Sequence, residues 1–307
     1  GDLEHSFMNT VLYSFFCYCS GKPLGDLVAD MRDYGNQMAE YNQKLQHKFL
    51  CLTWQMVLNL MGRCEDPVVL SDEAMSREAM LQEADNDNNP PLRSQVQCHR
   101  LQLAVYFGDY DLASYLVGQA SNIGSVNPGN VIVSRNALFE GIAVFELAHR
   151  GKRRFRTIGK RALTRVAKWV DAGNVNGVHM LHFLEAEQAA CLCDFTTARA
   201  WYDKTIATAA RFGFRNDQTL ANERCGQVLS RNTASYEDSV QLAADYLQKA
   251  LEVYTDLEAH GKVDHMVKQH ALLRPSVDIS LLGKHADVSA PLNDGPDGRT
   301  ISTESMF

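Results

Sequence analysis

Apolar residues recur at spacings of three and four along most of the chain, and short breaks of Gly, Asp, Asn or Pro separate these periodic segments. A period of this kind places the apolar side chains on one face of a helix. No segment rich in Val, Ile and Thr alternates apolar and polar residues as a half-buried strand would. The pattern therefore predicts an all-α protein.

The periodic segments fall into pairs, which predicts about six antiparallel helical hairpins. The pairs are residues 4–20 with 24–41, 45–62 with 71–84, 94–107 with 110–122, 130–150 with 153–171, 176–192 with 196–212, and 217–231 with 236–259.

Two regions interrupt this pattern. Residues 83–92 are polar and contain two prolines, which predicts a loop. After the last hairpin the chain has no helical period and is rich in proline and glycine, which is typical of disorder. We therefore predict a helical-repeat domain over residues 1–272 and a disordered tail over residues 273–307.

The second helix of each of the last four hairpins carries one repeated pattern, a small residue followed by a second position four places on and a third position three places later. Steps of four and three keep these positions on one face, and a small side chain lets two crossing helices approach closely. Stacked hairpins can bury such a face, whereas a single hairpin cannot, which favours an α-solenoid. The predicted packing stripe consists of Ala113, Val117, Ala120, Ala162, Val166, Trp169, Ala198, Tyr202, Thr205, Ala243, Leu247 and Ala250.

The turns GDY at 108–110 and CDF at 193–195, together with the alanine stripe, look like tetratricopeptide repeats. Three longer runs carry a closer resemblance, namely LQLAVYFGDYDLA at 101–113, the block at 181–229 that contains LANE, and AADYLQKALEVYTDLEAHGKVDHM at 243–266. They resemble the helical region that follows the AAA-type ATPase module in large multidomain signalling proteins with serine/threonine-kinase and histidine-kinase domains. The resemblance implies a non-catalytic spacer or platform that regulates neighbouring domains.

Composition narrows the function classes. The net charge of -7 gives the whole protein no general attraction for nucleic acid or for an anionic membrane. The eight cysteines lie among apolar residues, and no Asn-x-Ser/Thr sequon occurs, which favours a cytoplasmic location. The chain begins with Gly rather than Met, which suggests a segment of a longer protein.

The strongest charged feature is the run RGKRRFRTIGKRALTRVAK at 150–168, which contains nine Lys or Arg and no acidic residue. Such an excess can bind an acidic protein surface, phosphate or RNA, or it can be an ordinary solvated helix face. Few aromatic residues interleave with it, so nucleic acid is the less favoured partner. The candidate interaction residues are Arg153, Arg154, Arg156, Lys160 and Arg161.

Two motifs have residue types that can carry chemistry. His179, His182 and Glu185 recur every three residues, so they could share a helix face and hold zinc in a metal-dependent hydrolase. The segment GSVNPGNV at 124–131 has the glycine spacing of a phosphate loop, but Asn130 and Val131 replace the required Lys and Ser/Thr. We expect an interhelix turn there, and no cofactor.

Other polar residues on the first helices of the hairpins are expected to lie either in solvent, in interhelical hydrogen bonds or on an inner surface; they are Arg100, Arg135, Glu187, Asn222 and Glu223. Taken together, the sequence favours a non-enzymatic module that binds proteins or regulates neighbouring domains of a large ATPase or kinase. A freestanding tetratricopeptide-like adaptor that binds peptide segments is the main alternative.

Overall fold

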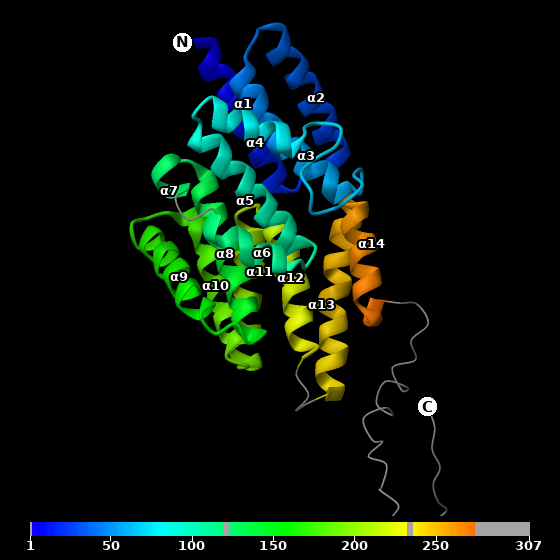
Figure 1. Ribbon diagram of the computed structural model, residues 1–307. Helices are drawn as coiled ribbons and strands as arrows, with labels where there is room; N and C mark the ends of the chain where they lie inside the picture. Colours follow the sequence, from blue (N-terminus) through cyan, green and yellow to red (C-terminus); the bar gives the residue numbers. More distant parts are fainter. Residues whose placement is uncertain (1, 120–122, 232–235, 274–307) are drawn as a thin grey trace, which may run out of the picture. The chain divides into compact units, whose positions relative to one another are not determined.

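The structure, a computed structural model, describes residues 2–119, 123–231 and 236–273. These residues form α-helices and two short 3-10 helices, and no strand occurs within these ranges, so the predicted all-α class is confirmed (Figure 1). The elements are α1 (Asp2–Ser20), α2 (Leu24–Glu40), α3 (Lys44–Met61), α4 (Arg77–Asn86), α5 (Pro90–Tyr106), α6 (Tyr110–Gln119), α7 (Ile123–Val126), α8 (Val131–His149), α9 (Phe155–Asp171), η1 (Val175–Gly177), α10 (Val178–Cys191), α11 (Phe195–Arg211), α12 (Arg215–Leu229), α13 (Tyr236–Asp256), α14 (His260–Gln269) and η2 (Ala271–Leu273).

The loop predicted over residues 83–92 is wrong for most of its length. Helix α4 continues to Asn86, and α5 already begins at Pro90. The Asn89 side chain accepts a hydrogen bond of 3.0 Å from the backbone N–H of Leu92 and so caps α5. Proline is tolerated in the first turn because its missing N–H would have no helical partner there. The prolines therefore mark a helix start rather than a loop.

Helices α8 to α13 pack in chain order, each against the next, and α8 also packs directly against α10 (Figure 1). Glycine permits close packing of α8 against α10 and of α9 against α8. A Cβ atom on Gly141 of α8 would lie 2.3 Å from a methyl carbon of Leu184 on α10, and one on Gly159 of α9 would lie 2.7 Å from the Phe145 ring. Apolar side chains of neighbouring helices therefore fill the space that these glycines leave.

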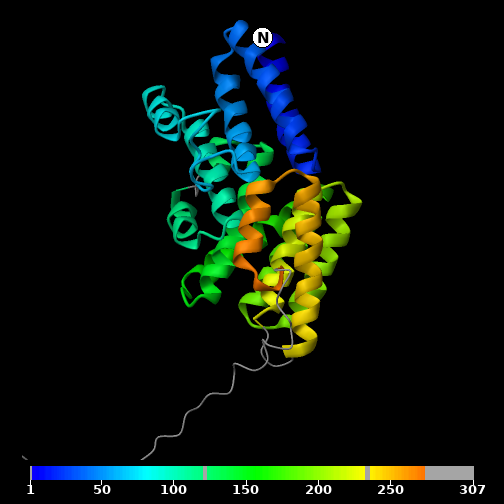
Figure 2. The ribbon, with the colours of Figure 1, turned by 90° about the vertical axis from the view of Figure 1, so that its right-hand side faces the viewer.

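The first and last hairpins also contact each other, which a strictly linear stack does not predict. The backbone N–H of Leu24 donates to the carbonyl of Leu257 at 3.0 Å, and α14 packs against α3 (Figure 2). A Cβ atom on Gly261 of α14 would lie 2.5 Å from the backbone nitrogen of Gly62, which ends α3. Helix α14 lies beyond the last hairpin predicted from sequence, which ended at residue 259.

The compact helical unit extends to Leu273, the last residue of η2 and one residue beyond the predicted domain boundary. The rest of the predicted tail, residues 274–307, lies outside the described residues. None of the helices in the described part of the chain combines the length and the apolar run that crossing a bilayer requires. All eight cysteines are free thiols, and Cys193 is exposed.

Candidate functional site

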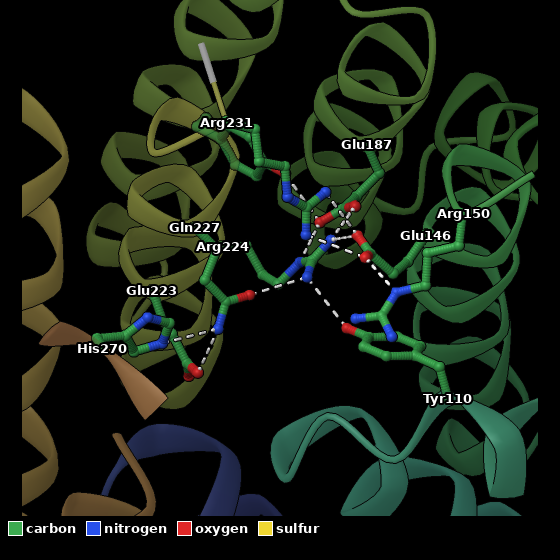
Figure 3. A network of polar contacts seen from close by, with 10 residues as sticks. Tyr110, Glu146, Arg150, Glu187, Glu223, Arg224, Gln227, Arg231 and His270 are labelled. Atoms are coloured by element: carbon green, nitrogen blue, oxygen red, sulfur yellow. Dashed lines mark hydrogen bonds and ion pairs between the residues drawn. The ribbon is translucent and has the colours of Figure 1, made fainter. Parts of the chain in front are cut away.

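A cluster of buried charges joins the first helices of three successive hairpins. Arg224 of α12 donates to both carboxylate oxygens of Glu187 on α10, at 2.8 Å each, and to Glu146 on α8 at 2.9 Å (Figure 3). Arg224 also donates to the Tyr110 hydroxyl at 3.0 Å and to the Gln227 amide oxygen at 2.9 Å. We call Glu146, Glu187 and Arg224 the central ion cluster; the exposed fraction of each side chain is at most 2%.

These side chains are buried because the helices that carry them are enclosed on all sides. Every residue of α8 from Arg135 to Ala148 is buried, and Asn222, Glu223 and Arg224 of α12 lie in a similar continuous run. A helix without a solvent face must pair its charged side chains with each other, since an isolated buried charge is strongly unfavourable. The charged side chains therefore form ion pairs because neighbouring hairpins cover α8 and α12 and leave them no solvent face.

Two further arginines enclose Glu146 at the rim of the cluster. Arg150 donates to it at 2.8 Å, and Arg231 donates to both of its oxygens at 3.0 Å (Figure 3). Burial opposes ionisation of this carboxyl, but the charges of Arg224 and Arg231 outweigh that effect and hold the pKa of Glu146 well below its usual range. Glu146 is thus an anion at every physiological pH.

A second group of polar contacts extends from the central ion cluster to α14. Gln227 donates to Glu223 at 2.9 Å and lies 3.3 Å from a ring nitrogen of His270 (Figure 3). Lys262, whose side chain is fully buried, donates to Glu223 at 2.7 Å and also to the carbonyl of Tyr106. Burial lowers the pKa of Lys262, although the neighbouring Glu223 carboxylate opposes that shift.

A cavity of about 270 Å³ opens beside these contacts, and its lining includes Arg150, Arg224, Arg231, His265 and His270. Burial lowers the pKa of His265 to about 4, and the charge of Lys262 acts in the same direction. The ring is therefore neutral at pH 7. Within the central ion cluster, burial opposes the charge of Arg224, but the neighbouring Glu187 carboxylate outweighs that effect and raises the pKa of Arg224.

A separate buried ion pair contacts one of the predicted metal ligands, His179. Arg135 of α8 pairs with Asp217 of α12, and Nε2 of His179 lies 2.8 Å from the same carboxylate oxygen. The His179 ring stacks on Phe214, with ring centroids 4.4 Å apart.

The other two members of the predicted zinc site lie elsewhere. A ring nitrogen of His182 lies 3.3 Å from the Thr208 hydroxyl, and the ring packs against Trp201. Glu185 is half-buried. No group of three or more His, Cys, Asp or Glu among the described residues is arranged to hold a metal ion. The geometry therefore gives no support to the zinc site expected for a metal-dependent hydrolase.

Most positions of the predicted packing stripe lie in helix interfaces. Ala113, Val117, Ala162, Val166, Ala198, Tyr202, Thr205, Ala243, Leu247 and Ala250 are buried, Trp169 is half-buried, and Ala120 lies outside the described residues. The clearest close approach is at Ala243, whose carbonyl oxygen would lie 2.9 Å from a Cβ atom on Gly226. Small residues on both helices thus bring α13 against α12.

The five candidate interaction residues, Arg153, Arg154, Arg156, Lys160 and Arg161, are all exposed at the start of α9. No ion pair links any of these five cations to a carboxylate of the described residues. Helix α9 has no acidic residue in its first turn, and its N-cap residue, Arg154, makes no side-chain cap.

Sequence reasoning did not single out Arg224, Glu146, Asp217 or Lys262. Of the five polar residues that it did note, Arg135, Glu187, Asn222 and Glu223 are buried, whereas Arg100 is half-buried. The available signal was a charged residue inside an otherwise apolar run, as at Glu146 in AVFELAH. Its partners Arg224 and Arg231 could not be named, because they lie 78 and 85 residues away along the chain.

In comparisons with known proteins, the chain matches no protein-family model and no curated protein.

Proposed function

We propose that this chain is a non-catalytic, cytoplasmic helical-repeat module that binds an acidic segment of a protein through the exposed basic surface at the start of α9. This basic surface consists of Arg153, Arg154, Arg156, Lys160 and Arg161. Its partner is either another domain of the same protein or a separate protein. Nucleic acid is the less favoured partner, because the aromatic residues near these cations are few.

The observation that carries the proposal is the sign of the charge at the start of α9. The amino end of a helix has a partial positive charge, so acidic side chains stabilise it and basic ones destabilise it. Here Arg154 occupies the N-cap position and Arg156 lies in the first turn, without an acidic residue to balance them. An acidic partner segment would neutralise both the arginines and the helix end.

The rest of the helical unit supports this role as a scaffold. The central ion cluster fixes α8, α10 and α12 relative to one another, and α9 packs against two of these helices, α8 and α10. A basic surface on such a support is held in one conformation, which lowers the conformational entropy lost on binding.

The test uses a fluorescein-labelled peptide of about ten glutamates, titrated with the full chain and followed by fluorescence anisotropy. The variant R153E/R154E/R156E should weaken binding at least about tenfold, because each change reverses a charge at the contact. Raising the salt from about 0.05 to 0.15 M should weaken binding of the unaltered protein as well.

A control variant carries the same charge change on other helices, at three exposed cations: Lys204→Glu, Arg211→Glu and Lys249→Glu. This variant should bind the peptide nearly as well as the unaltered protein. Equal losses in the two variants would mean that net charge alone attracts the peptide and would contradict the proposal. Tighter binding of a single-stranded RNA of similar length would favour the nucleic-acid alternative instead.

The resemblance to the helical region of large ATPase and kinase signalling proteins suggests the wider setting. In that setting the partner would be a neighbouring domain of the same chain, and the module would regulate it. The freestanding tetratricopeptide-like adaptor is the second candidate, and the stack of hairpins with small residues at its crossings favours it equally. The two differ in whether the acidic segment is covalently linked to the module, which the full gene sequence would decide.

A further inference from the structure

A second cavity, of about 590 Å³, lies where α1, α8, α9 and α10 meet the segment before α8. Its size falls within the range of small-molecule binding pockets. Three aromatic rings contribute to its lining, those of Phe16, Trp169 and Phe214. A cavity with such walls favours a ligand with a flat apolar body.

Arg135 is part of this lining and is almost completely buried, with 1% of its side chain exposed. Its Nη1 donates to Asp217, but its Nε and Nη2 have no hydrogen-bond partner among the described residues. A buried donor without a partner is destabilising. The two free donors belong to one guanidinium group, whose planar fork matches the two oxygens of a carboxylate.

Arg165 of α9 is a second lining residue with an unpaired donor, although 38% of its side chain is exposed. It pairs with Glu140 through Nη2, while its buried Nε has no partner within the described part of the chain. Its guanidinium carbon lies 6.0 Å from the centroid of the Trp169 ring, so charge and aromatic surface adjoin in the wall. The first residues of α8, including Val131 and Val133, also line the cavity and add the partial positive charge of a helix amino end.

The balance of charge limits the ligand to a small anion. Arg135 is already paired with Asp217 and Arg165 with Glu140, so the arginines of the lining combine unpaired N–H donors with little excess positive charge. A phosphate dianion needs more compensation than that, and the segment at 124–131 lacks the Lys and Ser/Thr that bind nucleotide phosphates. A carboxylate carries a single negative charge and two acceptor oxygens.

We propose that this cavity binds a small monocarboxylate with an aromatic body, its carboxylate held by Arg135 and Arg165 and its ring packed against the aromatic wall. The site is distinct from the basic surface at the start of α9. It gives the helical unit a small-molecule ligand in addition to a protein partner.

The first test titrates the full chain with 2-naphthoate and with its neutral analogue 2-naphthamide, by calorimetry and by quenching of tryptophan fluorescence. Naphthoate should bind with a stoichiometry near one and at least about tenfold more tightly than naphthamide, because only the carboxylate satisfies the free donors. Equal affinities for the two probes, or no saturable binding of naphthoate, would overturn the proposal.

Two neighbouring substitutions locate the site. Asn176 lines the cavity and is exposed, so Asn176→Trp should partly fill the entrance and weaken naphthoate binding at least about tenfold. Val175 is also exposed but does not line the cavity, so Val175→Trp should leave binding unchanged. Equal effects of the two variants would place the bound probe elsewhere and contradict the proposal.

The role of arginine charge in binding the carboxylate is tested at Arg165 rather than at Arg135, because loss of the fully buried Arg135 ion pair can prevent folding. Arg165→Gln should reduce the preference for naphthoate over naphthamide several-fold while leaving naphthamide binding nearly unchanged. An unchanged preference would show that Arg165 does not hold the carboxylate and would count against the proposal.

Discussion

Arg224 and Glu187 form a bidentate ion pair between α12 and α10, in which Nε and Nη2 of the arginine each lie 2.8 Å from a carboxylate oxygen. Both side chains are buried, and the same arginine also binds Glu146 of α8. The ion pairs of one side chain therefore link three hairpins. Because several charges share it, its removal has a larger effect than the loss of an ordinary ion pair.

Arg224→Met tests this dependence. The substitution keeps most of the side-chain volume but leaves Glu187 without its arginine, and we expect the free energy of unfolding to fall by about 3 to 5 kcal/mol. Urea denaturation followed by circular dichroism measures it. The control Arg199→Met removes an exposed arginine whose Nε lies 3.8 Å from Asp203, and its loss should stay below about 1 kcal/mol. Similar losses in the two variants would mean that the buried pair contributes no more than a surface pair.

The buried ring of His99 should make the protein less stable in mild acid. Burial lowers its pKa from 6.5 to about 4, although the hydrogen bond from its Nδ1 to the Gln95 carbonyl opposes this shift. Below pH 6.5 the unfolded chain binds a proton that the folded protein does not, so the contribution of His99 is complete above that pH and is lost as the pH falls toward 4.

Between about pH 7 and pH 5, we expect the free energy of unfolding to fall by roughly 1 to 2 kcal/mol more in the unaltered protein than in His99→Gln. Urea titrations at several pH values in this window measure the difference. The control His260→Asn changes an exposed histidine and should follow the unaltered protein. Parallel pH curves for the unaltered protein and His99→Gln would exclude this ring as the source.

Ala198→Arg tests the packing stripe. The side chain of Ala198 on α11 is completely buried, so the larger charged group has to displace its neighbours. We expect the free energy of unfolding to fall by at least about 1 to 3 kcal/mol. Ala207→Arg on the exposed face of the same helix should change the unfolding free energy by less than about 0.5 kcal/mol. Thermal and urea denaturation of both variants make the comparison. An unchanged melting temperature for Ala198→Arg would rule out a tightly packed crossing.

Gly261→Ala tests the contact between α14 and the end of α3. The added methyl group would lie 2.5 Å from the backbone nitrogen of Gly62, so α14 has to move away from α3. We expect the free energy of unfolding to fall by about 1 to 3 kcal/mol. Hydrogen exchange of α14 should become faster at the same time.

The control for this substitution is Gly118→Ala on α6, where no heavy atom lies within 4 Å of the added group. Because alanine favours a helix more than glycine does, this variant should be slightly more stable than the unaltered protein, by roughly 0.5 to 1 kcal/mol. If Gly261→Ala behaved like Gly118→Ala, the contact at Gly62 would not be tight.

The helices could be predicted from sequence because their determinants are local. Spacing places Ala198 and Tyr202 on one face whatever the rest of the chain does, and both are buried. The loop at 83–92 was predicted wrongly because Pro90 has two local meanings, helix breaker and first helical residue, and the cap at Asn89 decides between them.

The buried ion pairs could not be predicted, because their partners are distant in sequence. Lys262 contacts the carbonyl of Tyr106, 156 residues earlier, and no spacing rule links the two. The same holds for the arginine and aromatic residues that share the 590 Å³ cavity, since Phe16 and Phe214 meet there only after the hairpins have stacked.

The hydrogen bond between Leu24 and Leu257 also has a consequence for biosynthesis. A ribosome makes Leu24 more than 200 residues before its partner, so the side of α1 that packs against α12 leaves the exit tunnel long before α12 can cover it. A chaperone that holds newly made chains would bind this helix first and release it last.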